Sequence, residues 1–119
     1  MWVLPSDLTA ARLARGYVVG ACQGVSTEKL DVARLLVTEL VSNAVRHGSG
    51  TVLLVVARDG EGMRVDVYDE SPDLPVVVES RSLIEHGAGM RLVAALADSW
   101  GVDPRGDGRP GKQVWFALV

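Results

Sequence analysis

The sequence lacks several features that would place the protein in a special class. Cys22 is its only cysteine, so no disulfide can form within the chain, and its apolar neighbours indicate a small core residue. No apolar run approaches the roughly 20 residues that a membrane-spanning helix needs. The first residues, MWVLPSDL, lack the basic and apolar regions of a signal peptide. These absences predict a soluble cytoplasmic protein.

The charge balance gives no sign of a nucleic-acid or membrane partner. The 119 residues carry a formal net charge of −3, and Lys and Arg do not cluster in runs. A hydrophobic fraction of 48% and a charged fraction of 23% are typical of a folded globular protein. At this length we expect one domain over residues 1–119.

Periodicity and turn signals predict an α+β two-layer sandwich, with a mixed, mostly antiparallel sheet and helices on one face. The strands are expected at residues 2–4, 51–57, 63–68 and 113–118, with the first at an edge of the sheet. The helices are expected between Ser6 and Gln23, between Ser26 and Gly48, and from Gly89 to Ala97, with Gly101 as a stop. Asp59-Gly60 predicts a hairpin between the second and third strands. Loops are expected at residues 73–86 and 103–111.

One helical segment carries polar side chains along a single face. Residues 39–48 read ELVSNAVRHG, and Glu39, Asn43 and His47, which we call the polar stripe, recur every four residues. Four residues exceed one helical turn by about 40°, so the three side chains lie one above the other. Apolar residues run beside them, and a buried polar group without a partner is costly. The pattern indicates a cavity that holds something polar, although a solvated helix face is the commoner explanation of such a stripe alone.

Three further segments are ambiguous when each is taken alone. Asp69 ends a strand, where a carboxylate can meet a ligand but more often bonds nearby turn amides. Gly87-Ala88-Gly89 precedes a helix, and free amides at a helix N-terminus suit phosphate, although a loop that enters a helix needs glycine in any case. Lys112 precedes the last strand and is expected as a surface cation.

Together these segments resemble the GHKL superfamily of ATP-binding domains, and most closely the anti-sigma factor serine kinases and related short actinobacterial ATP-binding regulators. The polar stripe matches the family's N box, and Asp69 matches the aspartate of its first glycine box. Residues 87–90 match the GxG[LM] box that closes the ATP lid, and residues 111–118, GKQVWFAL, resemble the family's last strand. The likeness extends over about residues 5–118.

The resemblance implies a site for ATP and Mg²⁺ in a fold of the GHKL (Bergerat) type. Asn43 would coordinate the Mg²⁺ that bridges the phosphates, and Asp69 would accept a hydrogen bond from the adenine amino group. The amides near Gly87 and Gly89 would meet the phosphates, and Glu39 would take the proton of the attacking hydroxyl. The remaining nucleotide-binding candidates are Arg46, His47, Met90 and Gln113.

The resemblance also implies protein partners. In the family's kinases the phosphate acceptor is a serine on a small anti-sigma antagonist of the STAS type, and a second surface, on a dimer, binds the sigma factor. The leading hypothesis is therefore an anti-sigma factor serine/threonine kinase. It carries no expectation of nucleic acid or membrane as a partner.

The sequence departs from the family pattern on the adenine side. Asp69 is followed by Glu70-Ser71-Pro72 rather than by glycines, and Gln113 stands where the family often has Thr. These departures keep a second hypothesis open, a module that responds to nucleotide without kinase turnover. A third is a protein-interaction domain that has kept only the fold.

Overall fold

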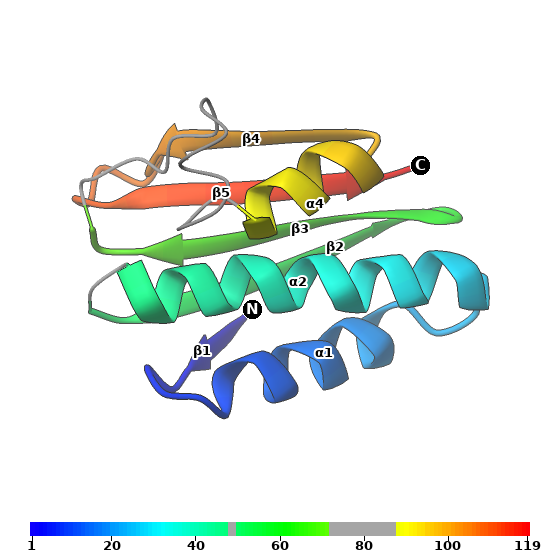
Figure 1. The fold of residues 1–119 in the computed structure, drawn as a ribbon, viewed down its shortest axis with the longest axis horizontal. Coiled ribbons are helices and arrows are strands. Elements are labelled where there is room, and N and C mark those ends of the chain that lie inside the picture. The colour runs from blue at the N-terminus through cyan, green and yellow to red at the C-terminus, as the bar shows by residue number, and fades with distance from the viewer. Residues whose placement is uncertain (48–49, 72–87) are drawn as a thin grey trace.

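The computed structural model describes residues 1–47, 50–71 and 88–119 and arranges them in two layers (Figure 1). Within these ranges three helices lie on one face of a five-stranded sheet. The strands are β1 (Trp2–Leu4), β2 (Val52–Asp59), β3 (Gly62–Asp69), β4 (Ser99–Pro104) and β5 (Lys112–Leu118). The helices are α1 (Ala10–Ala21), α2 (Thr27–His47) and α4 (Ala88–Leu96). The predicted α+β two-layer sandwich is confirmed.

The strands pair in the order β1-β2-β3-β5-β4, and each of these pairs is antiparallel. The sheet formed by the described strands is therefore antiparallel throughout, whereas a mixed sheet was expected. β1 lies at one edge, as its ending at Pro5 predicts. β5, the last strand along the chain, lies between β3 and β4.

A tight turn joins β2 to β3. Asp59 pairs with Gly62 across the two strands, and Gly60 between them has a φ of +61°. Glycine adopts this left-handed backbone conformation without a steric penalty, so the turn depends on it. The predicted hairpin is confirmed.

β4 is the strand that the sequence did not predict. Gly101 and Pro104 suggested a helix stop followed by a loop, because both residue types are rare in strands. In the structure a Cβ atom on Gly101 would lie 2.6 Å from Nε1 of Trp115 on the neighbouring strand. Glycine occupies this strand because the indole ring covers its position.

Side-chain hydrogen bonds determine where the first two helices begin. α1 starts at Ala10 rather than near Asp7, because the Asp7 carboxylate accepts a hydrogen bond from the N–H of Thr9 at 2.8 Å and forms a turn. α2 starts as expected, since Oγ of Ser26 accepts a hydrogen bond from the N–H of Lys29 at 3.3 Å. α4 ends at Leu96, close to its predicted end.

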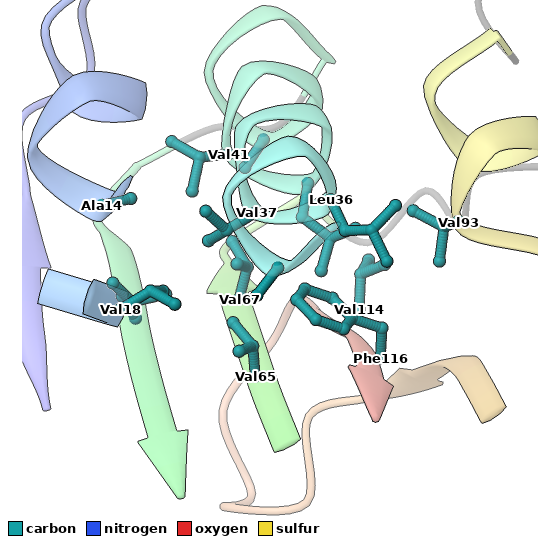
Figure 2. Close-up of a cluster of buried hydrophobic side chains, with 14 of the residues drawn as sticks. Ala14, Val18, Leu36, Val37, Val41, Val65, Val67, Val93, Val114 and Phe116 are labelled. Carbon is teal, nitrogen blue, oxygen red and sulfur yellow. The ribbon is translucent and has the colours of Figure 1, made fainter. Parts of the chain in front are cut away.

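One hydrophobic cluster joins the helices to the sheet (Figure 2). In β3 and β5 every second side chain faces the helices, as the two-residue period of a strand requires. α1, α2 and α4 close over these side chains. The labelled members of the cluster are Ala14, Val18, Leu36, Val37, Val41, Val65, Val67, Val93, Val114 and Phe116.

Cys22 and the helices bear on two expectations from the sequence, a buried cysteine and the lack of a membrane-spanning segment. Cys22 is fully buried after α1, as expected of a core residue, and this burial raises the pKa of its thiol. Among the described helices none combines the length and the apolar character needed to span a bilayer.

Candidate functional site

Four segments that carry predicted site residues meet toward one side of the molecule (Figure 1). α2 and β3 end on this side, β5 begins there, and α4 has its N-terminal end toward it, near the middle of the sheet. Asp69, the last residue of β3, pairs in register with Lys112, the first residue of β5. α2 packs against α4 and against both of these strands. Groups that are far apart in the sequence can therefore face one ligand.

The polar stripe lies on α2 at the margin of its buried face. Glu39 and Asn43 are half-buried, while Leu36 and Leu40 beside them are buried in the core. Within the part of the chain that the structure describes, neither Glu39 nor Asn43 makes a side-chain hydrogen bond or ion pair. His47 is the last residue of α2, and its side chain lies outside the described ones. A carboxylate and an amide on this helix thus remain available to a ligand.

Arg46 lies on another side of α2. Its exposed side chain lines a hollow of about 330 Å³ together with Leu8, Val41 and Val45. Ala11 of α1 borders the same hollow, so Arg46 is associated with the N-terminal segment. The structure does not bring it together with Asp69.

Asp69 is fully buried, although a carboxylate at a strand end is more often an exposed turn residue. Its Oδ1 accepts hydrogen bonds from the backbone N–H of Ser71 at 2.8 Å and from Nζ of Lys112 at 3.1 Å. The same Nζ lies 2.9 Å from Oδ2 as an ion pair without hydrogen-bond geometry. Among the described residues Oδ2 therefore has no hydrogen-bond donor. A buried acceptor in this condition is costly, and a ligand N–H would satisfy it.

Lys112 is a site residue that the sequence reasoning missed. It was expected on the surface, but it is only 3% exposed. The alternation in β5 could have revealed its burial. Lys112 lies on the same face of the strand as Val114, Phe116 and Leu118, which face the helices. A lysine in this inward phase needs a buried anion, and Asp69 stands opposite it.

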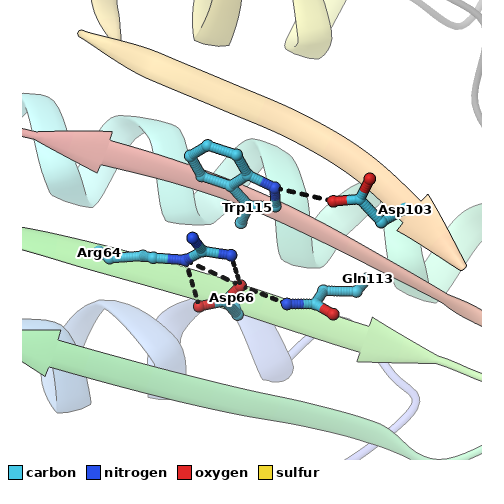
Figure 3. A network of polar contacts seen from close by, with 5 residues as sticks. All are labelled: Arg64, Asp66, Asp103, Gln113 and Trp115. Carbon is cyan, nitrogen blue, oxygen red and sulfur yellow. Dashed lines mark hydrogen bonds and ion pairs between the residues drawn. The ribbon is translucent and has the colours of Figure 1, made fainter. Parts of the chain in front are cut away.

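Gln113 lies on the uncovered face of the sheet, opposite to Lys112 (Figure 3). Its Nε2 donates a hydrogen bond to Oδ1 of Asp66 at 2.8 Å. Neighbouring residues of a strand point to opposite faces, so Gln113 is directed away from Asp69. Gln113 was expected to contact the nucleotide beside Asp69, but in the structure Lys112, not Gln113, lies beside Asp69.

The uncovered face carries a polar network of its own (Figure 3). Arg64 donates hydrogen bonds to both oxygens of Asp66, and this raises the pKa of Arg64. The guanidinium of Arg64 also lies 4.1 Å from the ring centre of Trp115, whose Nε1 donates to Asp103 at 3.1 Å. The network connects β3, β4 and β5 and accounts for Gln113 without a ligand.

α4 begins at Ala88, with Gly89 as its second residue. The first amides of a helix have no partner within it, and they lie at its positive end, so they suit a phosphate. Met90 is 2% exposed and belongs to the hydrophobic cluster, so its side chain serves packing. Gly87 lies outside the described residues.

Together the described residues supply groups that a nucleotide with its cation needs. Oδ2 of Asp69 has no hydrogen-bond donor among them, Asn43 has a neutral oxygen, and the first amides of α4 have no partner within the helix. No group of three or more His, Cys, Asp or Glu in the described ranges could hold a metal ion. Mg²⁺ is commonly held by one or two protein oxygens together with substrate phosphates. Asn43 therefore fits a cation that arrives with the phosphates.

Comparison with known proteins agrees with this geometry. The family model of the histidine kinase-like ATPase domain matches residues 2–118, which include all the described helices and strands. The predicted resemblance to the GHKL superfamily is thereby confirmed. No curated protein matches the sequence.

Proposed function

We propose that this chain, which belongs to the histidine kinase-like ATPase domain family, is a single-domain regulator that binds Mg-ATP and phosphorylates an anti-sigma antagonist. The observation that carries nucleotide binding is Oδ2 of Asp69, a buried acceptor without a hydrogen-bond donor among the described residues. Adenine presents a donor of the required kind in its exocyclic amino group. Family membership and this atom together support ATP as the ligand.

The phosphate end of the nucleotide is assigned to α2 and α4. Asn43 provides the protein oxygen for Mg²⁺, which neutralises charge on the phosphates when it is bound. The first amides of α4, around Gly89, bind phosphate oxygens. His47, which follows Asn43 by one helical turn, is assigned to the same region. The half-buried position of Asn43 without a partner in the described structure supports this assignment.

Glu39 is assigned as the general base. As the acceptor hydroxyl oxygen bonds to the γ-phosphorus, the bond between that phosphorus and the ADP oxygen breaks, and Glu39 accepts the hydroxyl proton. Phosphoryl transfer depends mainly on positioning and on charge neutralisation, so one base is enough. The half-buried position of the Glu39 carboxylate, without a partner among the described residues, supports this role.

The proposed substrate is a serine or threonine on a STAS-type antagonist, and the proposed second partner is a sigma factor, bound by a dimer in the cytoplasm. This part of the proposal derives from the resemblance to anti-sigma factor kinases. The test is to mix the purified protein with γ-labelled ATP, Mg²⁺ and candidate antagonist domains. Labelled serine or threonine in one domain supports the proposal. Bound nucleotide with no labelled domain contradicts the kinase activity.

The second candidate is a module that binds nucleotide without turnover. The segment after Asp69 favours it, because Oε2 of Glu70 accepts a hydrogen bond from the N–H of Thr51 at 2.5 Å and ties this segment to the residue that precedes β2. Such a contact holds the adenine side in place where the family has glycines. Calorimetry with ATP and ADP separates the candidates, since Mg-dependent binding without transfer favours the module. Absence of binding at millimolar nucleotide favours a protein-interaction domain.

A further inference from the structure

In the ion pair between Asp69 and Lys112, Oδ2 of Asp69 lies 2.9 Å from Nζ of Lys112 but has no hydrogen-bond donor among the described residues. Charge compensation alone does not require this asymmetry. We infer that Lys112 is a positioning residue, which orients Asp69 so that the candidate site selects a base with an exocyclic amino group. This inference deepens the proposed function and rests on it.

The asymmetry comes from two donors that share one oxygen. The N–H of Ser71 and the Nζ of Lys112 both donate to Oδ1 of Asp69, at 2.8 and 3.1 Å. The terminal torsion of an aspartate is soft and roughly twofold, so the carboxylate would otherwise rotate. With both donors on Oδ1 the orientation is fixed. Oδ2 lies 2.9 Å from the same Nζ, but no described donor makes a hydrogen bond to it, so it is left as the acceptor for a ligand.

The burial of the pair makes its hydrogen bonding selective. Asp69 is 0% and Lys112 3% exposed, so bulk water does not compete for Oδ2. An ionised carboxylate can only accept hydrogen bonds. The 6-amino group of adenine donates to it, whereas a 6-oxo base presents an acceptor at the same position. The oxo base would leave Oδ2 unsatisfied and would bring two lone pairs together.

An arginine at position 112 separates positioning from charge compensation. Arginine would keep the positive charge beside Asp69. Its planar fork donates two parallel hydrogen bonds to a carboxylate and would occupy Oδ2 as well as Oδ1. If Lys112 serves only to balance charge, Lys112→Arg should keep the selectivity of the wild type. If Lys112 serves to keep Oδ2 free, Lys112→Arg should lose that selectivity.

The experiment measures the affinities of ATP and inosine triphosphate, with Mg²⁺, by calorimetry. We expect the wild type to bind ATP at least about tenfold more tightly than inosine triphosphate. In Lys112→Arg this ratio is expected to fall below about threefold. The matched control is Lys29→Arg. The Lys29 ammonium donates to an exposed backbone carbonyl, that of Glu61, so this variant should keep the wild-type ratio. Circular dichroism establishes that each variant is folded.

The outcomes distinguish this inference from the proposed function. A wild type that binds neither nucleotide overturns both. A wild type that prefers ATP while Lys112→Arg keeps the same ratio overturns the inference alone. Failure of Lys112→Arg to fold would assign Lys112 to stability alone and would also overturn the inference.

Discussion

Gly111 lies directly against the end of β3. A Cβ atom on Gly111 would stand 2.0 Å from the carbonyl oxygen of Asp69. The φ of Gly111 is +126°, which side chains of L-residues rarely adopt. Both constraints exclude a side chain here, at the residue that precedes Lys112. The backbone of the loop thereby approaches Asp69 closely enough for the ion pair to form.

Gly111→Ala should therefore lower the free energy of unfolding by about 3 kcal/mol, through the clash and the strained backbone. Urea unfolding measures the effect. Gly106→Ala is the control in the same loop, because a Cβ there would have no atom of the described residues within 4 Å. It should change the free energy of unfolding by less than about 0.5 kcal/mol. Equal effects of the two substitutions would contradict the close approach.

Gly16→Ala should raise the free energy of unfolding, whereas Gly111→Ala lowers it. Gly16 lies inside α1 and is exposed, and a Cβ atom there would meet no atom within 4 Å in the described part of the chain. Glycine in a helix interior costs about 0.5–1 kcal/mol relative to alanine. Thermal unfolding should show a higher midpoint for the variant. A lower midpoint would mean that something covers this face of α1.

Asn43→Ala should weaken Mg-dependent ATP binding at least about tenfold. The fold should be unaffected, because the Asn43 side chain has no partner among the described residues. Its neighbour Ser42 is also half-buried, so Ser42→Ala is a control and should keep the wild-type affinity. Calorimetry with and without Mg²⁺ measures both. Unchanged affinity in Asn43→Ala would remove the residue from the site.

Glu39→Gln should separate binding from transfer. Affinity for Mg-ATP should stay within about threefold of the wild type, while phosphoryl transfer should fall by about 10²–10⁴-fold, as expected for loss of a general base. Glu28→Gln changes an exposed glutamate at the start of the same helix and should retain full transfer. Single-turnover kinetics with a responsive antagonist provide the rates. A transfer rate in Glu39→Gln equal to the wild-type rate would refute the general-base role.

The pair Arg105–Asp107 should make part of the stability depend on pH. Nη2 of Arg105 lies 2.7 Å from Asp107, and its hydrogen bonds hold the pKa of Asp107 below the usual 3.8. A lowered folded-state pKa gives stability that is present above pH 3.8 and is lost as the pH falls through the folded-state value. Asp107→Asn should thus be less stable than the wild type at pH 6. The difference should vanish in strong acid, and a difference that persists there would contradict the pairing.

Local patterns were sufficient to predict most of the fold. The hairpin at Asp59-Gly60 and the cap at Ser26 follow from single residues and their neighbours, and the structure has both. β4 was missed because Gly101 was taken as a helix stop. Its place in a strand depends on the ring of Trp115, which lies 14 residues further along the chain. Contacts of this kind leave no local signature.

The site was predicted less completely, because the prediction chose the wrong one of two adjacent residues in β5. Gln113 and Lys112 are neighbours, and a shift of one residue in a strand exchanges the two faces of the sheet. The family resemblance directed attention to Gln113, while the alternation in β5 favoured Lys112. The ion pair itself joins residues 43 positions apart, so it becomes evident only when β3 and β5 lie side by side.

The position of β5 has a consequence for the order of folding. β5 is the last strand along the chain, yet it lies between β3 and β4. Until residues 112–118 have been synthesised, β3 and β4 each lack the strand that pairs with them in the described structure, and Asp69 lacks the counter-charge of Lys112. Exposed strand edges invite pairing with other chains, so the incomplete polypeptide is prone to aggregation at this stage. Pairing of β5 with both of its neighbours and formation of the ion pair between Asp69 and Lys112 are then one event, so the candidate site takes shape only when the sheet closes.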